Sequence, residues 1–168
     1  PATTTTTTTT TLPPATTTTT TTTLPPTAVD YSYANLTLQI FDTLDLSASD
    51  FTGATLLGTH FLNSVLVDTN FTGSKGGGAK FNDADLSRAN FTNADFRDVV
   101  YGGAVFVDAD LTDTNFTGAD ISGSDLTGAD LTNASLRRVS LERATLTNAC
   151  LHGANLSRAD FRHATLDG

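Results

Sequence analysis

The sequence is poor in several residue types, and each shortage narrows what the protein can be. A single cysteine, Cys150, excludes a disulfide within the chain and leaves either an ordinary surface thiol or a bond to another molecule. Lys and Arg number 9 against 18 Asp and Glu, and the net charge of −9 disfavours binding to nucleic acid or to an anionic membrane surface. Because no apolar run approaches the roughly 20 residues that span a bilayer, we expect no membrane insertion.

Large apolar residues recur at every fifth position instead. Units such as Ala84-Asp85-Leu86-Ser87-Arg88 consist of a small residue, Asp or Asn, Leu or Phe, and two polar residues. The apolar series starts at Tyr31 and runs in steps of five to Leu166, and Gly76 is its one exception. A period of five fits neither the 3.6 of an amphipathic helix nor the 2.0 of a strand. A chain that turns a corner every five residues would point all these side chains at one axis.

This pattern resembles the pentapeptide-repeat family, and the resemblance covers residues 29–168. It implies an all-β fold: a right-handed, four-sided (quadrilateral) parallel β-helix of about seven coils, roughly 34 Å long at a spacing of about 4.8 Å per coil. Gly76 should leave a void in this interior, and Gly76-Gly77-Gly78 favours a local bulge. The Asp residues before the central positions should form hydrogen bonds at the corners.

Little in the repeat region indicates chemistry. His60, His152 and His163 fall on different sides or on distant coils, so they predict no metal site. The carboxylates are explained by the repeat better than by acid–base catalysis. We therefore expect no enzyme activity and no cofactor.

Residues 1–28 form a different segment, which we expect to be an extended tail. Two Thr runs each end in Leu-Pro-Pro, and such a segment has no apolar side to bury. It is either a linker or a mucin-like stalk with O-linked glycans. Pro1 stands where methionine would, from which we expect a removed leader and an extracellular or cell-surface location. The stalk interpretation places covalent glycans on Thr3, Thr4, Thr5, Thr6, Thr7, Thr8, Thr9, Thr10, Thr11, Thr16, Thr17, Thr18, Thr19, Thr20, Thr21, Thr22 and Thr23.

The charge is unevenly distributed along the repeats. Residues 29–68 hold five Asp and no Lys or Arg, whereas residues 129–168 hold five Arg against four acidic residues. Complementary ends favour head-to-tail association of identical chains into a filament. Paired outward valines favour lateral contacts. The residues predicted for self-association are Asp30, Asp50, Val65, Val67, Val105, Val107, Arg158 and Arg162.

The sequence thus predicts a non-enzymatic structural protein that assembles end to end into an extracellular fibre or surface layer. Two alternatives follow from the family resemblance. Some acidic members of the family mimic duplex DNA and bind a topoisomerase, and others are soluble lumenal proteins of photosynthetic cells.

Overall fold

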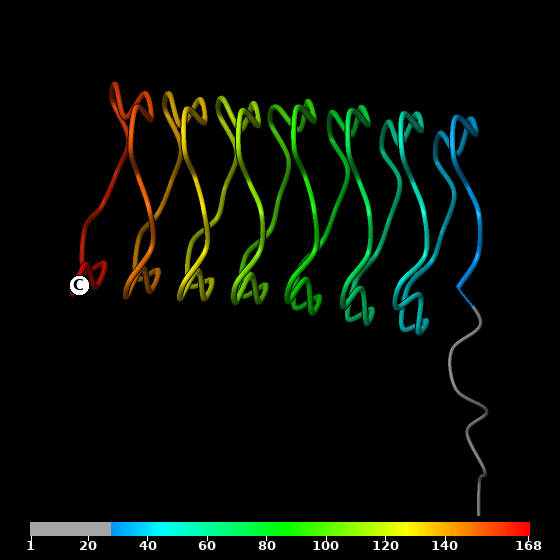
Figure 1. Cartoon of the computed structure of the whole chain (residues 1–168), viewed down its shortest axis with the longest axis horizontal. Coiled ribbons are helices and arrows are strands. Elements are labelled where there is room, and N and C mark those ends of the chain that lie inside the picture. The colour runs from blue at the N-terminus through cyan, green and yellow to red at the C-terminus, as the bar shows by residue number, and fades with distance from the viewer. Residues whose placement is uncertain (1–27) are drawn as a thin grey trace, which may run out of the picture.

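The computed structural model describes residues 28–168, in which the backbone winds into a rod of stacked coils (Figure 1). Successive coils are joined by parallel bridges between residues 20 positions apart, from Asp30–Asp50 to Thr145–Thr165. Within residues 28–168 these bridges are isolated, one in each five-residue unit, and they do not extend into strands or alternate with helices. One coil is therefore four five-residue sides, and the predicted parallel β-helix is confirmed at this level.

Each corner of the coil is a tight turn. At one of them the N–H of Ala94 donates to the carbonyl of Phe91 at 2.9 Å, and Asn93 between them has φ of 59°. A positive φ at the second turn residue is typical of a type II turn. Gly, Asn and Asp tolerate this backbone best, which accounts for their frequency two residues after the central position.

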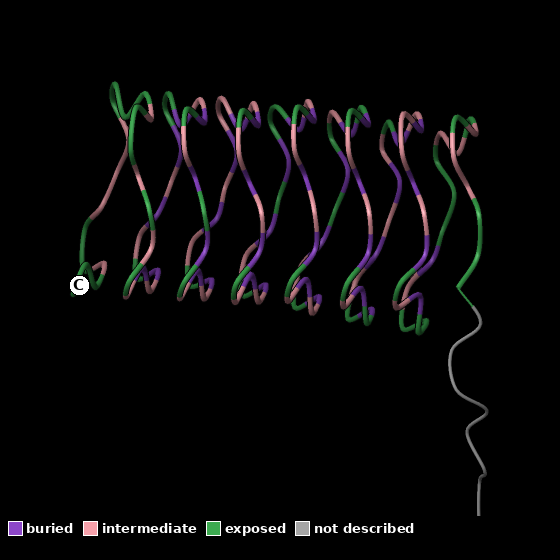
Figure 2. Ribbon diagram, in the orientation of Figure 1, coloured by how far each residue is buried: buried purple, intermediate pink, exposed green. Residues whose placement is uncertain are grey.

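The central Leu and Phe side chains form the core. Buried residues recur along the inner coils of the rod (Figure 2). Phe51, Phe71 and Phe91 are fully buried, and their rings stack along the axis with centroids 5.0 and 4.7 Å apart. The residue two positions before each central one also faces inward, as Ala84 and Ala89 do at 0% exposure. Because this inner position lies beside a ring or a leucine, a small side chain is required there.

Some inner positions hold hydroxyl side chains, which find partners on the backbone. Ser64 Oγ donates to the carbonyl of Phe41 at 2.8 Å, and Thr114 Oγ1 donates to that of Phe91 at 2.8 Å. A buried hydroxyl is costly only when it lacks a hydrogen bond. Ser and Thr therefore replace Ala at this position without a large loss of stability.

The structure corrects both expectations for the glycine run. Gly76 leaves no void, because the ring of Phe96 occupies the space that a side chain on Gly76 would take. Nor is there a bulge, because the bridges Thr55–Lys75 and Lys75–Asp95 keep the 20-residue register. Both expectations assumed that each side chain fills only its own coil, whereas the ring of Phe96 reaches the coil before it.

Within residues 28–168, the coils at the two ends are less buried than those between them. None of residues 149–168 is buried, and Leu156 and Leu166 are 38% and 53% exposed, although both hold central positions. At the other end Tyr31 and Leu36 are only half-buried. We call residues 29–48 the N-terminal edge and residues 149–168 the C-terminal edge.

Candidate assembly surfaces

The Asp and Asn residues that precede the central positions accept hydrogen bonds from the turns at the corners of the rod. Asp50 Oδ1 accepts hydrogen bonds from the N–H and the hydroxyl of Thr52 at 2.8 and 2.6 Å, and Asn70 binds Thr72 in the same way. This confirms the predicted role of Asp at the corners. Hydrogen bonds from Thr132 lower the pKa of Asp130. The carboxylates thus stabilise the adjacent turns, and asparagine side chains make the same hydrogen bonds at equivalent positions.

The described residues offer no enclosed site. Residues 28–168 contain no pocket and no group of three His, Cys, Asp or Glu that could hold a metal ion. The same part of the chain forms no helix long and apolar enough to cross a membrane. Cys150 is exposed on the C-terminal edge, with its Sγ 3.4 Å from Thr132 Oγ1. Candidate functional surfaces are therefore the two edges and the outer faces.

The backbone hydrogen bonds between coils follow one rule on every side, and among the internal coils of residues 28–168 the N–H of Gly78 is its exception. The central residue and the second turn residue donate to the next coil, as Phe91 N–H does to Asp110 O at 2.7 Å and Asn93 N–H to Thr112 O at 3.1 Å. The residue before the centre donates to the preceding coil, as Asn90 N–H does to Thr69 O at 2.9 Å. The rule leaves different groups unpaired at the two ends.

The two edges are complementary within the described part of the chain. On each side the C-terminal edge has two N–H groups and one carbonyl with no partner in residues 28–168, for example those of Leu156, Arg158 and Ala154. The N-terminal edge has two carbonyls and one N–H without a partner in residues 28–168 on each side. On one side these are the carbonyls of Asn35 and Thr37 and the N–H of Asn35. A translated copy of the rod would pair these groups by the rule that joins internal coils.

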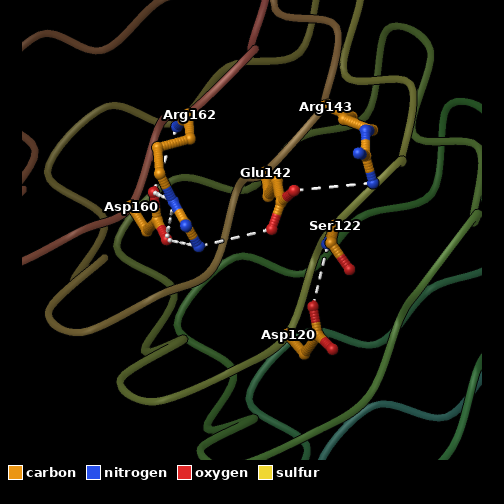
Figure 3. A network of polar contacts seen from close by, with 6 residues as sticks. All are labelled: Asp120, Ser122, Glu142, Arg143, Asp160 and Arg162. Atoms are coloured by element: carbon orange, nitrogen blue, oxygen red, sulfur yellow. Dashed lines mark hydrogen bonds and ion pairs between the residues drawn. The ribbon is translucent and has the colours of Figure 1, made fainter.

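The predicted charged residues lie at or near these edges. Asp30 bridges to Asp50, and the hydrogen bonds from Ser32 lower the pKa of Asp30. Arg162 is already engaged, at 2.7 Å from Asp160 and 3.4 Å from Glu142, and Glu142 also lies 3.5 Å from Arg143 (Figure 3).

Because Arg162 is paired with Asp160 and Glu142, its charge is partly neutralised within its own rod. Hydrogen bonds and attraction from Arg162 lower the pKa of Asp160. Arg158 has no ion partner within residues 28–168 and is exposed. Arg158 is therefore the more available positive charge of the two predicted arginines.

The predicted valines lie on one side of the rod but do not form a continuous surface. Val65 and Val105 belong to one column, in which both bridge to Asp85 between them. Val65 is 39% exposed, whereas Val67, Val105 and Val107 are half-buried. Any lateral contact through these residues would have to accommodate the intervening carboxylate.

A chain with isolated parallel bridges every five residues and an aromatic and aliphatic interior is a parallel β-helix of the pentapeptide type. The family model for pentapeptide repeats matches in 8 copies, over residues 45–75, 77–100, 89–128 and 124–163. The protein belongs to the pentapeptide-repeat family, whose members form right-handed quadrilateral β-helices. No curated protein sequence matches the chain.

Solved structures of this family superpose on the rod. One is HetL, a pentapeptide-repeat protein involved in heterocyst differentiation regulation from the cyanobacterium Nostoc sp. strain PCC 7120. It is 27% identical with a TM-score of 0.52, and the match covers 83% of this chain and 77% of HetL. A trypsin-treated form of QnrB1, a plasmid-mediated fluoroquinolone resistance protein, is 21% identical with a TM-score of 0.53, covering 84% and 83%. At that identity the second similarity shows the fold alone.

Proposed function

We propose that the protein is a non-enzymatic structural subunit whose rods assemble end to end into a filament. The observation that carries the proposal is the complementarity of the two edges. When a second rod continues the coil, the N–H of Leu156 meets the carbonyl of Asn35, and the N–H of Arg158 meets that of Thr37. Unpaired backbone groups at the end of a sheet are a template for another chain. A joint of this kind is heterologous and does not close on itself, so it propagates.

Side chains at the edges support the same joint. Leu156 and Leu166 on one edge and Tyr31 and Leu36 on the other continue the core columns, so stacking would bury them. Burial of apolar area contributes about 25 cal/mol per Å². Exposed Arg158 would approach an N-terminal edge that carries aspartates and no Lys or Arg. Such complementarity chiefly sets the orientation and rate of association.

The joint is tested by Leu166→Glu in the full 168-residue chain. Leu166 is 53% exposed, so the rod should fold, but a carboxylate at this point would be trapped in the joint. The matched control is Val100→Glu, which puts the same charge at a residue 36% exposed on the side of the rod. Light scattering should show large, concentration-dependent assemblies for wild type and control and monomers for Leu166→Glu. Monomeric wild-type protein at high concentration would refute the proposal.

The remaining parts of the proposal concern features that lie beyond the joint. We infer about seven coils, a tail that carries O-linked glycans, and an extracellular or cell-surface location. The tail lies outside the described residues, and its support is the Thr and Pro composition. Intact mass spectrometry tests the glycans, because a mass of 17.5 kDa is that of the bare chain.

The second candidate is a DNA mimic that binds a topoisomerase, favoured by the net charge of −9 and the rod shape. The other alternative from the family resemblance is a soluble lumenal protein. A topoisomerase inhibition assay and cell fractionation separate these from a filament subunit.

A further inference from the structure

An apolar surface lies at one corner of the rod near its N-terminal end. Leu38, Ile40 and Leu57 are 73%, 69% and 45% exposed there. The N–H of Leu38 donates to the carbonyl of Leu57 at 2.9 Å, so the two leucines are neighbours in successive coils. We call these three residues the apolar corner. Tyr33, at the neighbouring corner, is 79% exposed.

Glycines form the floor of the apolar corner. A Cβ on Gly58 would lie 2.9 Å from Leu38 Cδ2, and one on Gly77 would lie 3.5 Å from Leu57 Cδ2. Gly78 has nothing within 4 Å of the place of its Cβ. The surface beside the leucines is consequently bare backbone. This gives the glycine run at residues 76–78 an outer role besides the inner one at Gly76.

The same columns are polar farther along the rod, so the fold does not require apolar residues here. The repeat places a residue 20 positions later at the equivalent point of each coil. From residue 97 onward these positions hold one valine among charged, polar and glycine residues: Arg97, Asp98, Val100, Thr117, Gly118, Asp120, Arg137, Arg138, Ser140, Ser157, Arg158 and Asp160.

End-to-end stacking gives the apolar corner no apolar cover. The side chain of Leu38 lies over Gly58, that of Leu57 over Gly77, and the ring of Tyr33 over Gly53, where a Cβ would be 2.7 Å from Tyr33 Cδ1. All three side chains lean toward the following coil. By the 20-residue register, the joint proposed above would place the charged residues Arg158 and Asp160 of a second rod beside Leu38 and Ile40. It would leave Leu57, one coil further in, uncovered, so an apolar occupant is still needed.

We propose that this occupant is a Leu-Pro-Pro segment of the protein's own tail, Leu12-Pro13-Pro14 or Leu24-Pro25-Pro26. Together with Ala15, these segments hold the apolar residues within residues 3–27. Proline-rich peptides dock on aromatic-lined surfaces as preformed extended helices, and Tyr33 is the aromatic residue beside the corner. The tail joins the rod at residue 28, at the same end as the apolar corner. At about 3.1 Å per residue, the residues between Pro14 and the rod reach any corner of the first coils. Neither partner brings a charge to be desolvated.

Photo-crosslinking in the full chain tests the occupant directly. A benzophenone amino acid replaces Tyr33, whose 79% exposure makes the change tolerable, and a second sample carries it at Leu38. The control carries it at Val100, 36% exposed on the side of the rod. After irradiation, crosslinked peptides are identified by mass spectrometry.

The expected result is crosslinks from positions 33 and 38 to peptides containing Leu12 or Leu24, and none to the tail from position 100. In the Leu12→Ser/Leu24→Ser variant these crosslinks should fall at least fivefold. Crosslinks only to residues 28–168 of another molecule, or no crosslink to the tail, would overturn the proposal. Because light scattering measures the joint and crosslinking measures the corner, each proposal can fail without the other.

Discussion

The ring of Phe96 fills the place of the side chain that Gly76 lacks, one coil away in the same column. A Cβ built on Gly76 would overlap Phe96 Cε1 and Cδ1. The ring of Phe96 also packs edge-to-face against Phe71 and Phe81, which flank Gly76, with centroids 6.1 and 5.7 Å apart. The glycine and the phenylalanine therefore form one interlocked pair.

Substitutions at this pair should be coupled. Gly76→Leu overpacks the interior and should cost about 1–3 kcal/mol of unfolding free energy. Adding Phe96→Leu should recover part of that loss, because the column would then run through leucines as it does at Leu56. Urea unfolding of both single variants and the double variant gives the coupling energy. Simple addition of the two losses would show that the residues do not interlock.

Tyr101 carries the one buried side-chain polar atom in residues 28–168 without a hydrogen-bond partner. Burial raises the pKa of its phenol well above the ordinary value. Removing an unpaired buried hydroxyl relieves its desolvation cost, so Tyr101→Phe should raise the free energy of unfolding by about 1 kcal/mol. Tyr31→Phe, at a half-buried tyrosine of the N-terminal edge, is the control and should change little. A loss of stability in Tyr101→Phe, measured by urea unfolding, would mean that the hydroxyl has a partner.

Alanine substitutions at two corner glycines can distinguish the cost of backbone strain from the cost of side-chain crowding. Gly73 and Gly103 have φ of 63° and 76°, but a Cβ would meet nothing within 4 Å at Gly73 and would lie 2.5 Å from Asp83 Oδ1 at Gly103. Gly73→Ala should cost about 1–2 kcal/mol from the positive φ alone, and Gly103→Ala should cost more. In an Asp83→Ala background the two losses, measured by thermal unfolding, should become equal. If Gly103→Ala still cost more than Gly73→Ala in that background, the extra cost would come from the backbone and not from contact with Asp83.

Acid should weaken the rod through its corner carboxylates. The pKa values of Asp30 and Asp130 are lowered by hydrogen bonds from Ser32 and Thr132. A lowered pKa in the folded state stabilises the fold above the unfolded pKa of about 4, and this contribution is lost as the pH falls through the folded pKa. Asp30→Asn/Asp130→Asn keeps the acceptor oxygen and should lose less melting temperature between pH 5 and pH 2. An equal loss of melting temperature in the wild type and the double variant would show that Asp30 and Asp130 do not cause the acid sensitivity.

The period of five was sufficient to predict the interior, because a side chain such as Leu86 or Phe91 has one direction once the corners are set. It failed at Gly76, since a period describes positions and not how far a ring reaches. Arg162 was predicted for self-association, but a residue pattern does not reveal its pairing with Asp160 and Glu142. The sequence also held a signal for crowded corners that was missed. Gly103 and Gly118 each lie 20 residues after an aspartate, Asp83 and Asp98, whose side chain fills the space beside the glycine.

The apolar corner was only partly visible in the sequence. Leu38, Ile40 and Leu57 occupy outward positions of the five-residue repeat, but their separation along the chain does not show that they lie together. The bridges place residues 20 apart side by side, and the turns place Leu38 and Leu57 at one corner. The complementarity of the edges came from the hydrogen-bond rule of the internal coils, which no residue type encodes.

Electron cryomicroscopy of the purified full chain tests the account most directly. If the coil continues across the joint, filaments one rod wide should form with an axial repeat of about 34 Å, the length of one rod at about 4.8 Å per coil. Leu166→Glu should abolish them and Val100→Glu should not. Separate single rods at high wild-type concentration, or filaments whose repeat requires a gap between rods, would contradict the proposed joint.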